Sequence, residues 1–395
     1  MKKLTATILS MSVLTVMAGA AIAPALDIIG AHFTAQGVNE MTIKLIVSLP
    51  ALFIILTNML FHRISQHFST RSIALAGLLL YVLAGAGCYW ADDISVLLGL
   101  RALLGVSVGL LMPLSTGLLA YYFAPEKQAQ LMGLSAAMNQ LGGVVATAIA
   151  GVLAASCGWE YAFLVYLMGI PAMVLVVLFL PAERIGDKSK KGKTFSVQSL
   201  LKFHPSVVGM LLLMTIFFIF PTNFAQMASQ DAYLGQHHGM VTGIMVGLDM
   251  VALVMGLLFG RLMQRFRLSV KYFCPVLFLL GYGCYCLSMS LPMLIAGSVF
   301  AGMATGVGVP YLNTIASIKG GKTAATTVMP LLSAALYVGQ FVSPLIVTPI
   351  AQKCFAGYAQ GAFAVGCVLS VVMLVQVTAT RKFQSLPPVD TQAQG

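Results

Sequence analysis

Twelve stretches of about 20 or more mostly apolar residues follow one another along the chain, and they constrain the fold more than any other feature. About 20 apolar residues are needed for a helix to cross the hydrocarbon core of a bilayer. Because backbone groups cannot stay unpaired in lipid, each stretch is predicted to be a helix. The sequence thus predicts an all-α membrane protein with spans at residues 5–31, 41–61, 72–90, 95–122, 130–154, 161–180, 205–228, 240–260, 272–291, 293–316, 325–351 and 359–380.

The charged residues predict the orientation of these helices. Only 8% of the 395 residues are charged, and the net charge is +11. With the N-terminus inside, 19 of the 22 Lys and Arg residues fall in cytoplasmic segments. The positive charge is therefore a topology signal and predicts no nucleic-acid partner. Both termini are expected in the cytoplasm of a cell with a bacterial-type inner membrane.

The first stretch also imitates a secretory signal peptide, because two lysines precede its apolar run and an Ala-Ile-Ala follows. Cleavage would leave eleven spans and remove a segment that matches a later part of the chain. We therefore expect this stretch to be retained as the first span.

An internal repeat divides the chain into two halves. Matching residues recur 197 positions apart: Met17 and Pro24 with Met214 and Pro221, Gly105, Gly109 and Pro113 with Gly302, Gly306 and Pro310, and Gly142 with Gly339. Residues 66–68 also align with residues 264–266. The sequence predicts six-helix halves at 1–180 and 205–382, a cytoplasmic linker at 181–204 and a tail at 383–395.

The fourth span, with Arg101, Gly105, Gly109 and Pro113, resembles the fourth-helix motif of the major facilitator superfamily. Residues 122–163 are similar to the drug-efflux and sugar-efflux permeases of that family. The resemblance implies a monomeric, twelve-helix secondary transporter of pseudo-symmetric halves and no enzymatic activity. It further implies a small organic substrate, exchanged for protons by alternating access, without a cofactor or a metal.

Two motifs depart from the family pattern. The loop after the second span usually carries an Asp that latches the cytoplasmic gate, but Gln66 stands there, with Gln264 in the second half. We assign Gln66, Arg71 and Gln264 to this gate, and expect a less firmly held outward-facing state. The helix-5 antiporter motif is also altered, since Ala146 and Thr147 replace its Gly-Pro.

Three ionisable residues lie within spans, where a charge costs about 3 kcal/mol. An apolar setting favours the protonated form of a carboxyl group, so Asp249 and Asp27 are candidate proton carriers. The alternative for Asp249 is a fixed structural partner of a neighbouring polar group, and the alternative for Asp27 is a solvated gate contact near the outer surface. Arg101 stays protonated and is a candidate to hold an anionic substrate group, or to pin its helix to a carbonyl.

Uncharged polar residues on the predicted cavity helices are candidate substrate contacts. Interhelical hydrogen bonding is the alternative for each of them. They are Asn58, Asn139, Gln140, Asn223, Gln226, Asn313 and Gln340. Two other functions stay open: proton-coupled uptake of a metabolite, in which Arg101 holds an organic anion, and a sensor or scaffold that does not transport.

Overall fold

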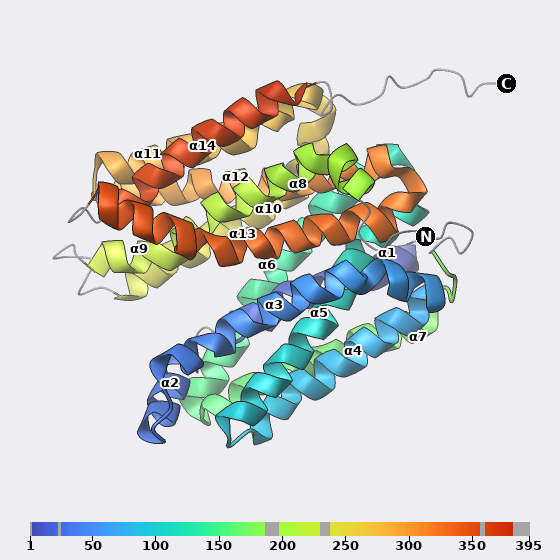
Figure 1. The fold of residues 1–395 in the computed structure, drawn as a ribbon, viewed down its shortest axis with the longest axis horizontal. Coiled ribbons are helices and arrows are strands. Elements are labelled where there is room, and N and C mark those ends of the chain that lie inside the picture. The colour runs from blue at the N-terminus through green and yellow to red at the C-terminus, as the bar shows by residue number, and fades with distance from the viewer. Residues whose placement is uncertain (1, 23–24, 186–196, 230–237, 356–359, 382–395) are drawn as a thin grey trace.

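The computed structural model describes residues 2–22, 25–185, 197–229, 238–355 and 360–381, and every regular element in these ranges is helical (Figure 1). The first half contains α1 (Lys2–Ala20), α2 (Leu26–Ala35), α3 (Glu40–His67), α4 (Thr70–Gly87), α5 (Ile94–Tyr122), α6 (Pro125–Ser156) and α7 (Gly169–Phe179). The 3₁₀ segment η2 (Cys88–Trp90) follows α4, and the 3₁₀ segment η3 (Trp159–Met168) precedes α7.

The second half contains α8 (Val197–Phe217), α9 (Ile219–Ser229), α10 (His238–Phe266), α11 (Phe273–Leu287), α12 (Leu291–Gly320), α13 (Ala324–Cys354) and α14 (Gly361–Ala379). The 3₁₀ segments η5 (Arg267–Tyr272) and η6 (Gly321–Thr323) precede α11 and α13. The prediction of an all-α membrane fold is confirmed.

Eleven stretches of the described chain are long and apolar enough to span a bilayer. The tenth runs over Leu291–Cys354 and contains both α12 and α13, which pack against each other, so it accounts for two of the twelve predicted spans. The first predicted span is divided into α1 and α2, and the seventh into α8 and α9. Pro221 stands in the first turn of α9, where its missing N–H is tolerated. The helix α8 begins at Val197, inside the predicted linker.

Glycine contacts reproduce the internal repeat in three dimensions. A Cβ atom on Gly105 of α5 would strike the carbonyl oxygen of Pro50 in α3. The equivalent Gly302 of α12 is packed in the same way against the carbonyl oxygen of Leu248 in α10. The two glycines are 197 positions apart and their two partners 198, so the halves pack corresponding helices through corresponding residues.

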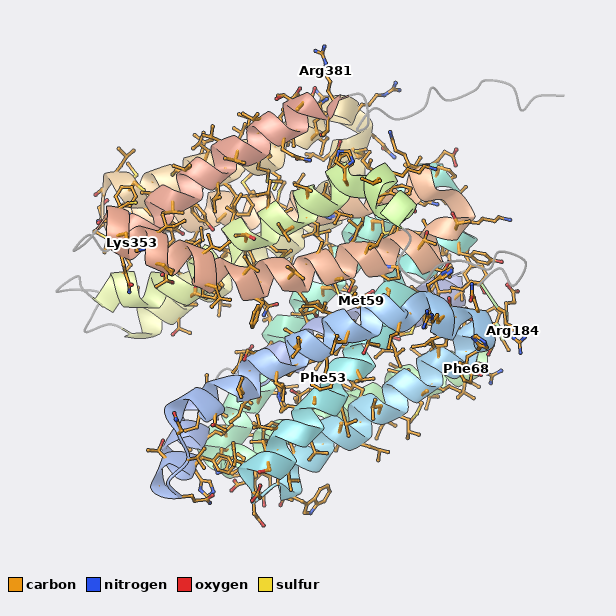
Figure 2. All side chains as sticks on the ribbon, in the orientation of Figure 1. Phe53, Met59, Phe68, Arg184, Lys353 and Arg381 are labelled. Carbon is orange, nitrogen blue, oxygen red and sulfur yellow. The ribbon has the colours of Figure 1, made fainter. Side chains whose placement is uncertain are left out.

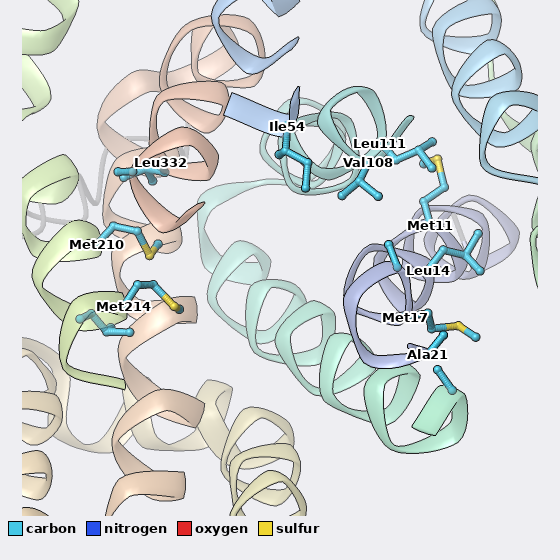
Figure 3. Close-up of a cluster of buried hydrophobic side chains, with 14 of the residues drawn as sticks. Met11, Leu14, Met17, Ala21, Ile54, Val108, Leu111, Met210, Met214 and Leu332 are labelled. Atoms are coloured by element: carbon cyan, nitrogen blue, oxygen red, sulfur yellow. The ribbon is translucent and has the colours of Figure 1, made fainter. Parts of the chain in front are cut away.

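Each half has its own apolar core. In the first half, Met11 and Leu14 of α1 lie beside Val108 of α5, and in the second half Met210 of α8 lies near Leu332 of α13 (Figure 3). All five side chains are buried. Burying apolar side chains between helices in this way stabilises each bundle through close van der Waals contacts.

The two bundles meet at one end of the molecule and diverge at the other (Figure 1). We call the end that carries Lys2 and Arg381 the terminal end, and the opposite end, where α2 and α9 lie, the distal end. Figure 2 labels Phe68 and Arg184 at the terminal end and Lys353 at the distal end.

Candidate functional site

The first contact between the halves is a close crossing of α6 and α10. A Cβ atom on Gly133 of α6 would lie 2.5 Å from the carbonyl oxygen of Gly256 and 2.8 Å from Cβ of Phe259 in α10. On Gly256, it would lie 3.0 Å from the backbone nitrogen of Ala137. The two helix backbones are therefore in contact at these glycines. A residue with a side chain at either position would force the helices apart.

The second contact is the crossing of α3 and α13, and it is polar. The side-chain Nδ2 of Asn58 donates a hydrogen bond to Oγ of Ser333 at 2.8 Å. Both side chains are buried, and Oδ1 of Asn58 has no hydrogen-bond partner among the described atoms. In this structure Asn58, a candidate substrate contact, is an interhelical tie between the halves.

Near the terminal end, α6 and α12 are joined by Gln128. The Oγ atom of Ser317 donates to Oε1 of Gln128 at 2.6 Å. The Nε2 atom of Gln128 donates to the carbonyl oxygens of Ala120 at 3.1 Å and Phe123 at 2.9 Å, at the end of α5. Gln128 is 3% exposed, so this amide joins three helices in an apolar setting.

The same end is also closed by backbone packing between α5 and α13. A Cβ atom on Gly117 would lie 2.9 Å from both Cα and the carbonyl oxygen of Ala325. At the distal end, α2 packs on α3, whereas α9 packs on α8, α10, α13 and α14, and Figure 1 shows the two diverging. Within the described residues the halves are therefore in backbone contact at the terminal end, and their helices diverge at the distal end.

Asp249 and Gln140 lie on facing surfaces just beyond the α6/α10 crossing. Gln140 is seven residues after Gly133, and Asp249 is seven residues before Gly256. Seven residues are nearly two full helical turns, so each side chain shares a face with the glycine of its helix. Since α6 and α10 run in opposite directions, both residues lie on the distal side of the crossing, at mid-height in their helices.

The surroundings of Asp249 supply no counter-charge. Its side chain is half-buried. Along α6 and α12, which pack against α10, the charged residues are Glu126, Lys127 and Lys319. All three stand at the terminal ends of their helices. A carboxyl group at mid-height thus faces the other half without an ion-pair partner among the described residues.

Arg101 is fully buried inside the first half. Its Nε donates to the carbonyl oxygen of Ile46 in α3 at 3.0 Å, and Nη1 to that of Ala18 in α1 at 3.2 Å. Nη1 also donates to the hydroxyl of Tyr166 in η3 at 2.8 Å. This arrangement ties α5 to three neighbours, as the structural alternative for Arg101 predicts, while Nη2 has no partner among the described atoms.

Three further candidates lie on α6, α9 and α12. Asn139 accepts a hydrogen bond from Oγ1 of Thr15 in α1 at 3.2 Å, so it bonds within the first half. Asn223 donates to the carbonyl oxygen of Ile219 at 2.9 Å, within α9. Asn313 of α12 is half-buried.

Gln340 of α13 is also half-buried and stands seven residues after Ser333. It therefore lies distal to the α3/α13 crossing, as Gln140 does at the other crossing. The side chains of Asp27 in α2 and Gln226 in α9 fall outside the described residues.

The predicted gate residues lie near the terminal end. The Nε2 atom of Gln66 is 3.1 Å from Nε2 of His62 on the same helix. Arg71 donates to the carbonyl oxygen of Val177, which ties α4 to α7 within the first half. Gln264 is exposed on α10. Their role in gating stays a prediction.

Sequence reasoning missed three of the four described residues that join the halves through these side-chain hydrogen bonds, and named only Asn58. Ser317 and Ser333 do not stand out in the sequence, because small polar residues are frequent in apolar helices. Gln128 lies in the first turn of α6, after Pro125, a position that predicts a solvent-exposed side chain. In the structure its side chain is buried. No signal in one sequence marks these positions, because burial depends on how each helix is rotated.

Residues 8–344 match the sequence profile of the Major Facilitator Superfamily. A multidrug transporter protein, MdtP of Bacillus subtilis, is 23% identical over 150 residues, which are 38% of this chain and 27% of that protein. A multidrug resistance protein B homolog of Mycobacterium tuberculosis is 28% identical over 148 residues, 37% of this chain and 27% of that protein. The matched region is thus about a quarter of the length of these relatives.

Solved structures share the whole fold. The proton:xylose symporter XylE superposes with a TM-score of 0.75 at 14% identity, over 95% of each chain. The Escherichia coli fucose:proton symporter FucP gives a TM-score of 0.73 at 13% identity, over 97% of this chain and 98% of that one. The human organic anion transporter MFSD10 gives 0.75 at 16% identity, over 95% and 99%. At these identities the similarity concerns the fold alone.

Proposed function

The chain belongs to the Major Facilitator Superfamily and is a multi-pass membrane transporter rather than an enzyme, and from this premise we propose that it exports a small organic solute in exchange for protons. The unpaired carboxyl group of Asp249 carries the proposal. It lies at mid-height on the face of α10 that turns toward the other half, where substrate and coupling-ion sites of such folds lie.

Exchange of substrate for protons needs one group that binds either a proton or the substrate, but not both at once. A carboxylate in an apolar setting is stabilised either by a proton or by a partner with a positive or donor group. Asp249 has no such partner within the described residues, so proton and substrate compete for it in this proposal. In each turnover the substrate displaces the proton from Asp249, and a new proton binds after the substrate has left.

The distribution of Lys and Arg supports a cytoplasmic terminal end. Lys2, Arg63, Lys127, Arg265 and Lys322 all stand at helix ends or connections on this side. With this orientation in the inner membrane, the end at which the halves diverge faces outward in our proposal, and the end at which they are in contact faces the cytoplasm. Asp249 is then reached from the outside, where an energised cell holds the higher proton concentration.

The curated relatives support export over uptake, since both sequence relatives described above carry multidrug names. The alternative of an organic anion held by Arg101 finds no support in the geometry. Arg101 is fully buried within the first half, and its guanidinium already donates to two helix carbonyls and a phenol. Within the described residues, an anion between the halves would meet no cation at mid-height.

The test is proton release from energised everted vesicles that contain the protein, followed with a pH-sensitive dye. A panel of drugs, sugars, amino acids and organic acids is added to the cytoplasmic face. We expect one class of compound to release lumenal protons, and Asp249→Asn to abolish this response while the protein still folds. The matched control is Asp92→Asn, which removes an exposed carboxylate near the distal end and leaves the response intact.

Full proton release by Asp249→Asn would overturn the role of this residue. If no compound of the panel releases protons, but one of them accumulates in intact cells that express the protein, export is overturned and uptake is established instead.

A further inference from the structure

We propose that Gln140 is a positioning residue for Asp249: in the state that is closed at the distal end, its side-chain amide hydrogen-bonds the carboxyl group of Asp249. The proposal rests on the proposed function for its consequence in transport. Its geometry rests on the α6/α10 crossing alone.

The crossing fixes which residues meet when the distal end closes. Gly133 and Gly256 are in backbone contact, so α6 and α10 can approach no further there and the halves must rotate about this point. Gln140 and Asp249 lie about 10 Å from it along each helix, at a rise of about 1.5 Å per residue. They are the first polar residues on the two facing surfaces beyond the crossing.

Both side chains are available for this contact. They are half-buried, and neither makes a hydrogen bond within the described residues. The neighbouring Asn139 points elsewhere, because it accepts from Thr15 of α1. Closure of the distal end would bring the two free groups together and withdraw both from water.

An amide suits this role because it serves both protonation states of the carboxyl group. Its NH₂ group donates to the carboxylate, and its carbonyl oxygen accepts from the protonated acid. Without it, the distal end could close only over a protonated Asp249, because a buried carboxylate without a donor is strongly unfavourable. Gln140 therefore determines at which pH the transporter can complete its cycle.

No other charged group of the packed helices competes for Asp249. The charged residues of α6 and α12 are Glu126, Lys127 and Lys319, at the terminal ends of these helices, and the described part of α9 contains none. The segment η5, which also packs against α10, carries Arg267 and Lys271 beyond the terminal end of that helix. The phenol of Tyr311 in α12 is nine residues beyond Gly302, which packs beside Leu248. It is therefore about 13 Å along the helix from the level of Asp249.

Gln352 supplies a matched control. It stands near the distal end of α13, and its side chain is exposed. The change of Gln352 to Leu removes the same amide group away from the carboxyl group of Asp249.

The first experiment measures the pH dependence of substrate-driven proton exchange in vesicles. We expect Gln140→Leu to move the pH of half-maximal exchange about one unit toward acid, a tenfold change in proton concentration. Gln140→Glu replaces the donor with a second carboxyl group, which also disfavours the carboxylate of Asp249, and we expect a shift in the same direction. Gln352→Leu should leave the profile unchanged.

The second experiment measures closure itself and keeps Asp249 and Gln140 intact. Val144 and Met245 lie one turn further toward the distal end on the same faces of α6 and α10. In Val144→Cys/Met245→Cys, an added oxidant such as copper phenanthroline takes two electrons from the two thiols, and a disulfide should form when the distal end closes. Adding Gln140→Leu should reduce its formation at alkaline pH and leave it intact at acid pH, whereas adding Gln352→Leu should change neither.

Unchanged pH profiles for both Gln140 variants would overturn the positioning role, as would crosslinking that ignores Gln140→Leu. Neither result touches the role of Asp249, which is tested by Asp249→Asn. Conversely, crosslinking that responds to Gln140→Leu while Asp249→Asn still exchanges protons would support the contact and overturn the proposed function.

Discussion

The two crossings between the halves occupy equivalent places in the repeat but are built differently. At the α6/α10 crossing two glycines bring the backbones together, and a carboxyl group faces a glutamine on the distal side. At the α3/α13 crossing Asn58 donates to Ser333, and Ala51 stands seven residues before Asn58, on the distal side. Corresponding helices of the repeat are thus in contact on both sides, while among the described residues the carboxyl group lies beside the α6/α10 crossing alone.

The order of polar and apolar contacts is also reversed between the two sides. Beside α6, the crossing is apolar and the terminal end is joined by the hydrogen bond between Gln128 and Ser317. Beside α13, the crossing is polar and the terminal end is closed by Gly117 against Ala325. Each side therefore has one polar tie, at a different height, and a rotation of the halves must break them at different stages.

The largest effect should follow from filling the glycine crossing. Gly133→Val places side-chain atoms where the carbonyl oxygen of Gly256 and Cβ of Phe259 lie, so the helices must separate. We expect a loss of about 3 kcal/mol in stability, measured as the fall in thermal midpoint in detergent. Gly243→Val is the control, because the space around that glycine is open within 4 Å. Equal midpoints for the two variants would contradict a close crossing.

A smaller effect should follow from removing the polar tie at the terminal end. Gln128→Leu loses the contact with Ser317 and leaves two carbonyl oxygens of α5 without this donor. We expect the terminally open state to gain about tenfold in population, since a lost buried hydrogen bond is worth about 1 kcal/mol or more. The measurement is thiol labelling of Ala325→Cys from the terminal side.

The control for this measurement is Gln264→Leu, which changes an exposed glutamine. If Gln264→Leu opened the terminal end and Gln128→Leu did not, closure would depend on the loop motif rather than on the buried amide.

The smallest effect should follow from removing the polar tie at the other crossing. Asn58→Leu loses one hydrogen bond to Ser333 and also removes an amide oxygen that has no partner in the described structure. We expect a net loss of about 1 kcal/mol, seen as a small fall in thermal midpoint. A loss as large as that of Gly133→Val would mean that the two crossings do not differ in kind.

Composition and periodicity predict the fold well, because lipid leaves helices as the only way to pair the backbone of an apolar stretch. The repeat also predicts which glycines pack alike, and Gly105 and Gly302 do so. Breaks inside spans are harder to place: α8 and α9 separate at Phe217 and Ile219, although the apolar run continues through them.

The site is less predictable, because one sequence does not fix the rotation of a helix. The structure gives Asn58 and Asn139 partners on other helices and places Gln140 on the same side of its crossing as Asp249. All three are polar residues in apolar helices and look alike in the sequence. The direction each one faces is set by packing at glycines and serines several turns away.

The buried guanidinium of Arg101 bears on how the protein is made. Its partners come from α1, α3 and η3, so two are synthesised before it and the hydroxyl of Tyr166 arrives 65 residues later. A lone arginine in a span is costly to leave in lipid, and α5 therefore depends on its neighbours from the moment it enters the membrane. At the equivalent position the second half has Ser298, which bonds Tyr285 and Leu294 nearby in the chain. Burial of this guanidinium therefore requires α1, α3 and η3 together, whereas Ser298 of α12 bonds to residues nearby in the chain.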